Sequence, residues 1–379
     1  MSAAHIRSHA SLRGIAAILV VMYHLQYGGG YHLIFENYTS IPTRLYLFVD
    51  FFFILSGFIL CHVSYRVNSK LSFANSYMLF IKARVARLYP LHLFCLAYLL
   101  LFQLAIILFY SIFHRVAPFT LDFQITYGLI AQVLLLNAYL PIQPMWNIPT
   151  WSISAEVSAY LFFPFAFVTL INNNKLSLIL LSVVPLFFYL TIIFGESIGL
   201  HSLDITVGLG WIRCLAGFFT GMILFSFRAI FVKIGNFGLS ALQIIAATAV
   251  LLGLALPISD PLIIPVFVLL IGSTWPDRGI LASALNVKPL LWLGEISYSI
   301  YLNHVCVVNI LGFFWSRIRV LDEFHPSAVR LTWIILVYSV TILLSWWTYQ
   351  YVERGGRQWL GRRWASGPVA PITTSPPAP

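Results

Sequence analysis

Long apolar runs, separated by short polar segments, fill almost the whole chain. Runs of helical length lie at 12–28, 44–65, 89–113, 153–171, 176–195, 207–226, 240–258, 260–275, 295–316 and 329–352. A helix needs about 20 apolar residues to cross a hydrocarbon core of about 30 Å, so each run is a candidate membrane span. The pattern predicts an all-α membrane protein, a bundle of about ten transmembrane helices.

A further apolar stretch, about 125–143, is shorter and contains Gln132 and Asn137. The basic residues indicate whether it crosses, because cytoplasmic loops carry the excess of Lys and Arg. If it does not cross, 16 of the 22 basic residues fall on the inner side: Arg7, Arg13, Arg66, Lys70, Lys82, Arg84, Arg87, Lys175, Arg228, Lys233, Arg278, Lys288, Arg354, Arg357, Arg362 and Arg363. If it crosses, the two sides carry nearly equal numbers. We therefore predict ten spans with both termini cytoplasmic, and a re-entrant segment at 125–150 that enters from the outer face.

The amino-acid composition and charge limit which ligands and partners are expected. Hydrophobic residues make up 60% of the 379 and charged residues only 9%, whereas a soluble chain carries roughly a quarter charged residues. Orientation in the lipid bilayer explains the formal charge of +10, so no nucleic-acid partner is expected. The four cysteines lie in apolar segments without disulfide or metal spacing, so no metal is expected. One transmembrane domain is predicted over 1–364, and a disordered cytoplasmic tail rich in Pro, Ser and Thr over 365–379.

Ionisable residues within the predicted spans are few, and each is a functional candidate because a charge there costs about 2.5–3.5 kcal/mol. They are His24, Asp50, Glu156, Arg213 and His304, with Arg13, Arg84 and Arg87 near the inner edge. Eleven helical steps bring Arg13 and His24 within roughly 20° of each other on one helix face, about 16 Å apart along the axis. Because this first apolar run carries both residues and lacks a cleavage pattern, we interpret it as a retained span rather than a signal peptide.

His24 lies toward the outer end of the first span, where an imidazole could take a proton from a hydroxyl near neutral pH. The alternative is a buried histidine that only donates a hydrogen bond. Ser152 and Glu156 stand four apart at a helix start, where Ser152 could cap the helix and Glu156 could face inward. Glu156 could orient a histidine, as the acid of a catalytic triad does, or it could pair with Arg213 for structure alone.

Arg84 and Arg87 stand three apart in KARVARLYP and share a helix face. Guanidinium groups bind phosphates through two parallel hydrogen bonds, so the pair could clamp a phosphorylated substrate. The alternative is a basic anchor that only orients the chain in the membrane. The sequence contains no GxSxG, P-loop, GxGxxG or HExxH motif, which disfavours hydrolase, nucleotide-dependent and zinc-dependent activities.

Six segments occur in an order and spacing typical of one known family. They are SLRGIAAILVVMYHL, DFFFILSGFIL, KARVARLYP, WSISAEVSAYLFFP, GEISYSIYLNHV and YVERGGR. Over about 10–358 the chain resembles the acyltransferase-3 family, membrane acyltransferases that modify surface polysaccharides, lipopolysaccharide, Nod factors and some antibiotics. Ala10 and Val157 depart from the family pattern, because acidic residues are common at both positions.

The resemblance implies a multi-pass O-acyltransferase of the inner (plasma) membrane. It would move an acyl group, expected to be acetyl, from acyl-CoA to a hydroxyl of a carbohydrate or glycolipid, such as an exopolysaccharide or O-antigen. Acyl-CoA is then a co-substrate, and no resident cofactor is expected. The expected catalytic residues are His24 as base, Glu156 as its orienting acid and Arg13 at the oxyanion. The expected substrate-binding and donor-binding residues are Arg84, Arg87, Trp151, Ser152, Asp50 and His304. A covalent acyl-histidine is equally compatible with these residues.

Two other function classes fit the same intramembrane residues. A secondary transporter could use His, Glu and Arg side chains as a proton or substrate path, although the sequence shows no paired halves with matching broken helices. A structural or flippase-like partner of a polysaccharide assembly complex would not need His24. Acyl transfer from labelled acetyl-CoA, gradient-driven uptake and the phenotype of His24→Ala distinguish the three classes.

Overall fold

A computed structural model of the chain describes residues 6–25, 39–66, 72–114, 123–140, 146–171, 175–195, 202–315 and 326–365. These ranges contain helices and no β-strand, which confirms the predicted all-α fold class. The helices are α1 (Arg7–Leu25), α2 (Ile41–Arg44), α3 (Phe48–Arg66), α4 (Phe73–Ile112), α5 (Phe123–Val133), α6 (Thr150–Ile171), α7 (Lys175–Phe194), α8 (Gly210–Ser226), α9 (Arg228–Lys233), α10 (Asn236–Ala255), α11 (Ile264–Thr274), α12 (Ile280–Leu285), α13 (Lys288–Glu295), α14 (Ser297–Trp315), α15 (Pro326–Thr348) and α16 (Arg354–Ala365). The predicted tail lies almost wholly outside the described residues.

The predicted spans correspond to helices of two lengths. Within the described ranges, eight helical segments are long and apolar enough to cross a membrane. Two of these join neighbouring helices, Ile41–Arg66 and Ala328–Trp364. Two shorter apolar helices, Gly210–Ser226 and Asp260–Thr274, occupy the remaining two predicted positions. The chain is therefore a multi-pass membrane protein, with eight full-length helical segments and two shorter helices at the ten predicted places.

Helix α4 begins well before the predicted boundary at residue 89. It is one continuous helix of 40 residues with Pro90 inside it, and Ser72 caps its start by accepting a hydrogen bond from the Asn75 backbone N–H. At 1.5 Å per residue such a helix is about 60 Å long, which exceeds the thickness of a bilayer. Arg84 and Arg87 consequently lie within this continuous helix and not before its start.

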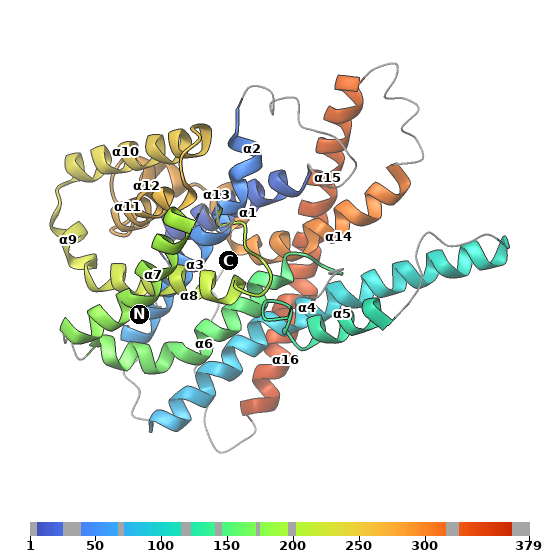
Figure 1. Ribbon diagram of the computed structural model, residues 1–379, viewed down its shortest axis with the longest axis horizontal. Coiled ribbons are helices and arrows are strands. Elements are labelled where there is room, and N and C mark those ends of the chain that lie inside the picture. The colour runs from blue at the N-terminus through green and yellow to red at the C-terminus, as the bar shows by residue number, and fades with distance from the viewer. Residues whose placement is uncertain are drawn as a thin grey trace.

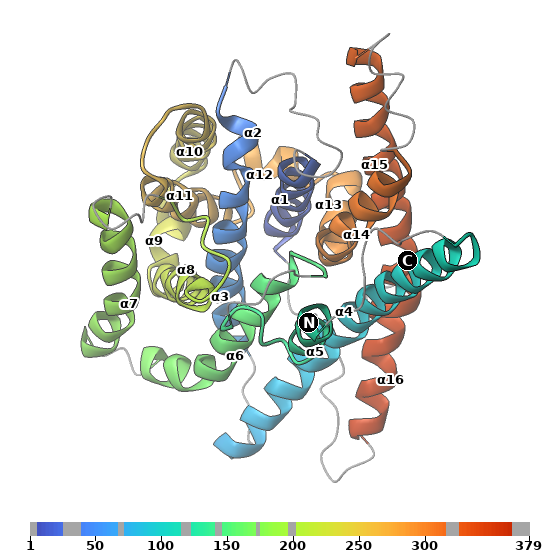
Figure 2. The ribbon, with the colours of Figure 1, turned by 45° about the vertical axis from the view of Figure 1, so that its right-hand side comes forward.

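Three helices form the centre of the bundle. Helices α1, α3 and α14 are the most buried of the long segments, and α4, α7, α10 and α15 are much less covered by the rest of the chain. Figure 2 shows α1 and α3 in the middle, with α6, α7 and α8 on one side and α4, α14, α15 and α16 on the other. Figure 1 shows α10, α11 and α12 grouped beside the same core. The side chains of the central helices are therefore shielded by protein.

Helices α3 and α8 approach closely because small residues lie between them. A Cβ atom at Gly221 would collide with the backbone of Ile54, and one at Gly57 would collide with the Phe218 carbonyl. This approach allows an ion pair between Arg213 and Asp50, with 2.7 Å from Nη2 to Oδ2 and both side chains fully buried. The alternative that Arg213 pairs with Glu156 is therefore wrong, because Asp50 holds the Arg213 guanidinium.

The segment between α4 and α6 contains a short helix followed by non-helical backbone. Helix α5 has 11 residues, about 16 Å, which is too short to cross a bilayer. The Asn147 amide N–H donates to Gln132 Oε1 (3.1 Å), and the Asn147 side chain donates to the Leu302 carbonyl (3.0 Å). The Ala138 N–H donates to Ser154 Oγ (3.1 Å). Neighbouring helices thus satisfy polar backbone groups here, as a re-entrant segment requires; residues 141–145 lie outside the described ranges.

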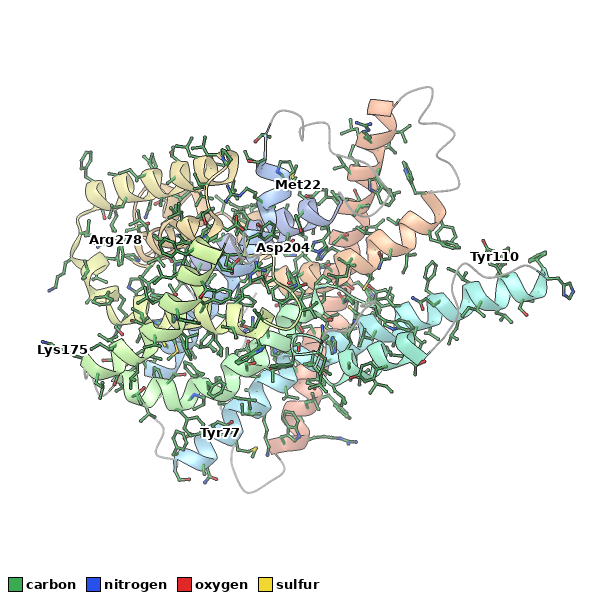
Figure 3. All side chains as sticks on the ribbon, in the orientation of Figure 1. Met22, Tyr77, Tyr110, Lys175, Asp204 and Arg278 are labelled. Atoms are coloured by element: carbon green, nitrogen blue, oxygen red, sulfur yellow. The ribbon has the colours of Figure 1, made fainter. Side chains whose placement is uncertain are left out.

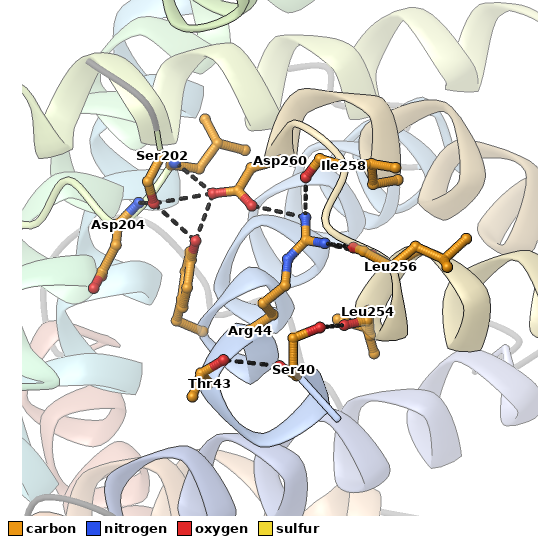
Figure 4. Close-up of polar contacts among 12 residues, drawn as sticks. Ser40, Thr43, Arg44, Ser202, Asp204, Leu254, Leu256, Ile258 and Asp260 are labelled. Atoms are coloured by element: carbon orange, nitrogen blue, oxygen red, sulfur yellow. Dashed lines mark hydrogen bonds and ion pairs between the residues drawn. The ribbon is translucent and has the colours of Figure 1, made fainter. Parts of the chain in front are cut away.

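Helix ends gather in two groups. At one end, Arg44 donates to Asp260 (2.9 Å), Ser202 donates to the same carboxylate (3.0 Å), and Ser40 donates to the Leu254 carbonyl (2.9 Å), as Figure 4 shows. These residues come from or adjoin loops predicted to lie outside.

Figure 3 labels residues from both predicted sides of the membrane. Met22, Asp204 and Tyr110, predicted near the outer side, lie toward the top, centre and right of the view. Arg278, Lys175 and Tyr77, predicted near the inner side, lie toward the left and bottom. This arrangement agrees with helices that alternate in direction.

Candidate active site

A cavity of about 300 Å³ lies between α1, α3, α4, α6 and the start of α14. Its charged lining residues are Arg13, Arg66, Arg84, Arg87 and Glu156. Arginine therefore outnumbers acid in a space that is otherwise lined mainly by aliphatic and aromatic side chains. Such a cavity favours a ligand with a negatively charged end and an apolar or flexible remainder.

Arg84 and Arg87 face this cavity from α4, as their three-residue spacing predicts. The Arg84 guanidinium lies 5.5 Å from the centre of the Phe80 ring and 5.8 Å from that of Tyr160. Its Nε atom is buried and has no hydrogen-bond partner among the described residues. Arg87 interacts electrostatically with Glu156 and with other acidic and phenolic groups. The two arginines are thus held in place by their neighbours, and the Arg84 Nε–H remains able to donate a hydrogen bond to a ligand.

Arg13 lines the same cavity, so the structure groups it with the arginine pair. Its Nη2 atom donates to the Gly294 carbonyl at 3.3 Å, and its buried Nε atom has no partner in the described part of the chain. His24 stands eleven positions later on α1, about 16 Å along the axis. This distance is too long for Arg13 to contact an oxyanion formed beside His24.

Glu156 lies in the cavity beside the arginines. Its Oε1 atom accepts a hydrogen bond of 2.8 Å from Ser56, and the carboxylate also interacts with Tyr160. The side chain that lies beside His24 is instead that of His304, from α14. Glu156 is therefore positioned to balance the charge of Arg84 and Arg87, and the expected contact with His24 is not formed.

His24 and His304 are in direct contact. The His304 Nε2 atom lies 3.1 Å from His24 Nδ1, and the two ring centres are 4.7 Å apart. His304 is fully buried, whereas His24 is half-buried. Sequence spacing could not show this contact, because the two residues stand on different helices and 280 positions apart.

A thin wall separates the histidine pair from the cavity. Ser152 and Tyr301, which both line the cavity, share a hydrogen bond of 2.7 Å. The Tyr301 ring also lies 5.9 Å from the Phe52 ring and 5.9 Å from the His304 ring, centre to centre. The predicted cap at Ser152 is wrong, because α6 begins at Thr150 and the Ser152 hydroxyl donates to the Pro149 carbonyl. The cavity and the histidines are thus one aromatic layer apart.

Asp50 and Trp151 lie beside the cavity rather than on its lining. Both Asp50 carboxylate oxygens accept from Arg213, at 3.0 and 2.7 Å. The Trp151 ring centre lies 5.2 Å from the same guanidinium, and the Trp151 and Phe53 rings pack edge to face, 6.0 Å apart. Their contacts join α3, α6 and α8, which gives both residues a structural position.

Several residues of the site were not among those predicted from the sequence. Tyr160 stands four residues after Glu156, so helical spacing could have found it. Tyr301 and Tyr298 lie in the segment SYSIYLNH, and both line the cavity. Glu353 is buried in a π-helical turn, accepts from Ser299 at 2.9 Å, and interacts electrostatically with Arg87. Irregular turns of this kind occur frequently at functional sites.

No group of three metal-ligating side chains occurs in the part of the chain that the structure describes. The charged residues of the cavity are arginines with one glutamate, a set suited to an anion.

Comparison with known proteins finds a family and two partial relatives. A family model described as an acyltransferase domain matches residues 11–350. The chain is 33% identical over 129 residues to the acyltransferase MdmB of Streptomyces mycarofaciens, which is 33% of this chain and 29% of that protein. It is 36% identical over 86 residues to protein 2 in the picA locus of Rhizobium radiobacter, 23% of this chain and 39% of that protein. The matches therefore span less than half the length of either relative. No solved structure matches the chain.

Proposed function

The chain belongs to this acyltransferase family, and from that premise we propose that it transfers an acyl group from acyl-CoA to a hydroxyl of a carbohydrate or glycolipid. Acetyl is the proposed acyl group, and exopolysaccharide or O-antigen sugars are the proposed acceptors. The proposed setting is the inner (plasma) membrane, with both termini and the donor site on the cytoplasmic side. This orientation follows from the Lys and Arg distribution.

The observation that carries the proposal is the arginine-lined cavity. Acyl-CoA has several phosphates at one end, a flexible pantetheine arm and a thioester at the other end. Arg13, Arg84 and Arg87 meet at the cavity, and Arg13 and Arg84 have buried Nε atoms without a hydrogen-bond partner in the described part of the chain. Guanidinium groups are well suited to phosphate, because they donate two parallel hydrogen bonds and remain charged when buried. A phosphorylated ligand would supply the acceptors that these arginines lack.

The position of His24 supports the same donor. Arg13 and His24 lie on one face of α1, about 16 Å apart, a separation that the pantetheine arm can span. Phosphates held at Arg13, Arg84 and Arg87 would place the thioester near the wall formed by Tyr301 and Phe52. Movement of that wall would bring the thioester carbonyl to His24.

The proposed reaction is a direct transfer. The His24 Nε2 atom takes the proton of the acceptor hydroxyl while the oxygen attacks the thioester carbonyl carbon. The tetrahedral intermediate breaks its C–S bond, and the CoA sulfur leaves and takes the proton from His24 Nε2. The products are an O-acyl ester and free CoA, and His24 returns to its starting state. An acyl group carried for a time on His24 Nε2 would use the same residues in two steps.

The test is transfer of a labelled acetyl group from acetyl-CoA in detergent-purified protein supplied with membrane glycolipid or polysaccharide. The labelled product should appear only with donor, acceptor and protein together, and mass spectrometry of the glycan should locate the ester. Binding of CoA should be much tighter than binding of pantetheine, which lacks the phosphates. Gradient-driven uptake without acyl transfer would instead make the protein a transporter.

A further inference from the structure

His24 and His304 each have one ring nitrogen beside a carbonyl oxygen of their own helix. His24 Nδ1 lies 3.0 Å from the Val20 carbonyl, and His304 Nδ1 lies 3.2 Å from the Ile300 carbonyl. Both carbonyls are four residues earlier, which is one helical turn. A carbonyl oxygen can only accept a hydrogen bond, so each Nδ1 atom carries its hydrogen.

This assignment fixes the direction of the contact between the rings. A neutral imidazole with its hydrogen on Nδ1 has a free electron pair on Nε2. The His304 Nε2 atom, 3.1 Å from His24 Nδ1, is therefore the acceptor, and the His24 Nδ1–H is the donor. The same hydrogen is shared between the Val20 carbonyl and His304. The His24 Nε2 atom is left with a free electron pair.

The free nitrogen is also reachable. His24 Nε2 has no hydrogen-bond partner in the described ranges, and it is not one of the buried unpartnered atoms there. Both nitrogens of His304 are engaged, and its side chain is fully buried. Of the two histidines, therefore, only His24 has a ring nitrogen that is free to contact a substrate.

We propose that His304 is a positioning residue for His24. Together with the Val20 carbonyl, it holds the His24 hydrogen on Nδ1 and so keeps Nε2 as the base that faces the acceptor hydroxyl. This inference rests on the proposed acyl transfer for its consequence, but its geometry does not depend on that function. His304 takes the part expected of Glu156, with a neutral ring in place of a carboxylate.

The arrangement also serves the charged state of His24. When Nε2 takes a proton from the acceptor hydroxyl, the ring becomes an imidazolium, and its Nδ1–H becomes a stronger donor. His304 Nε2, on a fully buried side chain, is then an acceptor already in place. The Ile300 carbonyl keeps the hydrogen of His304 on its far side, so the acceptor pair cannot be lost by exchange of the tautomer.

A second fully buried histidine, His92, has different contacts. Its Nε2 atom contacts only the Gln132 carbonyl, and its Nδ1 atom has no partner among the described residues. His92 therefore serves as a matched control for substitutions at His304. The control and the test position share residue type and burial.

The first arm of the test is spectroscopic and needs no substrate. In protein labelled with ¹⁵N-histidine, His24 and His304 should both show a protonated Nδ1 and a bare Nε2. A coupling across the N–H···N hydrogen bond should connect His24 Nδ1 with His304 Nε2. A His24 ring protonated on Nε2, or the absence of this coupling, would overturn the proposal.

The second arm compares two replacements of similar size. His304→Gln offers an amide oxygen that can accept from His24 Nδ1–H, and His304→Met cannot accept comparably. The Met variant should lose about 10²-fold in kcat with little change in KM for acyl-CoA, and the Gln variant should recover most of that loss. His92→Gln and His92→Met should differ little from each other in kcat. Equal losses in the two His304 variants, or no loss in either, would refute the positioning role. A wild-type protein without transfer activity would refute the proposed function and leave the spectroscopic arm decisive.

Discussion

The Arg213 guanidinium and the Asp50 carboxylate form an ion pair with two hydrogen bonds and no solvent exposure. The pair joins α8 to α3 in the centre of the bundle, and the Trp151 ring lies beside it. Among the described residues, no other side chain of opposite charge lies at hydrogen-bond distance from Arg213 or from Asp50. The two charges therefore depend on each other.

Removing one member of this pair should destabilise the protein strongly. Asp50→Ala or Arg213→Ala leaves a buried charge without its partner, which costs about 3–5 kcal/mol. Thermal unfolding in detergent should show a clear loss for each single variant. The double variant Asp50→Leu with Arg213→Met should recover much of it, because it removes both charges. Single variants that unfold like the wild type would contradict a structural pair.

The glycines between α3 and α8 should tolerate no side chain. Gly221→Ala places a methyl group against the backbone of Ile54 and Phe58, so the helices must separate. Such overpacking typically costs about 1–3 kcal/mol. Gly355→Ala is the control, because a Cβ atom there meets nothing within 4 Å. The unfolding temperature should fall for the first variant and not for the second; the reverse order would contradict the close approach.

His24→Ala should abolish acyl transfer and leave the protein in the membrane. The change removes the proton acceptor, and general-base catalysis typically contributes 10²–10⁴-fold. Met22→Ala shortens a side chain in the same turn of α1 and should keep most of the rate. The assay is labelled acetyl transfer, normalised to the amount of membrane protein. A rate above about a tenth of the wild type would argue against His24 as the base.

The arginine pair can be tested without disturbing membrane orientation. Changing Arg84 and Arg87 to Lys keeps the positive charge but loses the planar donor groups that bind phosphate in pairs. The KM for acyl-CoA should rise far more than kcat falls. Arg228→Lys, outside the cavity lining, controls for the substitution itself. Unchanged kinetics in the double variant would leave the pair as an orientation anchor and would place the donor elsewhere.

The predicted sidedness is open to cysteine labelling, since Cys61, Cys95, Cys214 and Cys306 are all buried and should give little background. Cysteines introduced within 28–43 and 196–206 should react with an impermeant reagent from outside. One introduced in the tail after residue 365 should react only after the membrane is opened. Labelling of the tail from outside would rule out ten spans with cytoplasmic termini.

The lengths of the apolar runs predicted the helical class and the positions of the spans well, because a membrane helix must be apolar along its whole length. It misplaced the start of α4, because Asn75, Lys82 and the arginines interrupt the apolar run while the helix continues. Arg84 and Arg87 line a cavity between helices, and this polar surrounding allows them inside a long apolar helix. Hydropathy along the chain carries no information about such a cavity.

The site was predictable only as far as one helix could specify it. Spacing placed Arg84 with Arg87, and it placed Arg13 on the face of His24. The partners across helices were assigned differently by the structure: Asp50 holds Arg213, and His304 contacts His24. These contacts depend on which helices are neighbours and at what height, and residue spacing within a single helix does not determine either.

Because Arg13 and His24 share α1, the helix fixes the distance between the proposed phosphate site and the proposed base. A loop between them could stretch, but a helix with intact hydrogen bonds has a fixed rise of about 1.5 Å per residue. One residue inserted between the two positions would turn Arg13 by about 100° away from the face of His24. If acyl-CoA binds as proposed, the number of residues in α1 sets where the thioester carbon stops, and it sets no limit on the length of the acyl chain beyond that carbon. Selection among acyl groups must then come from the walls around His24 rather than from the grip on the phosphates.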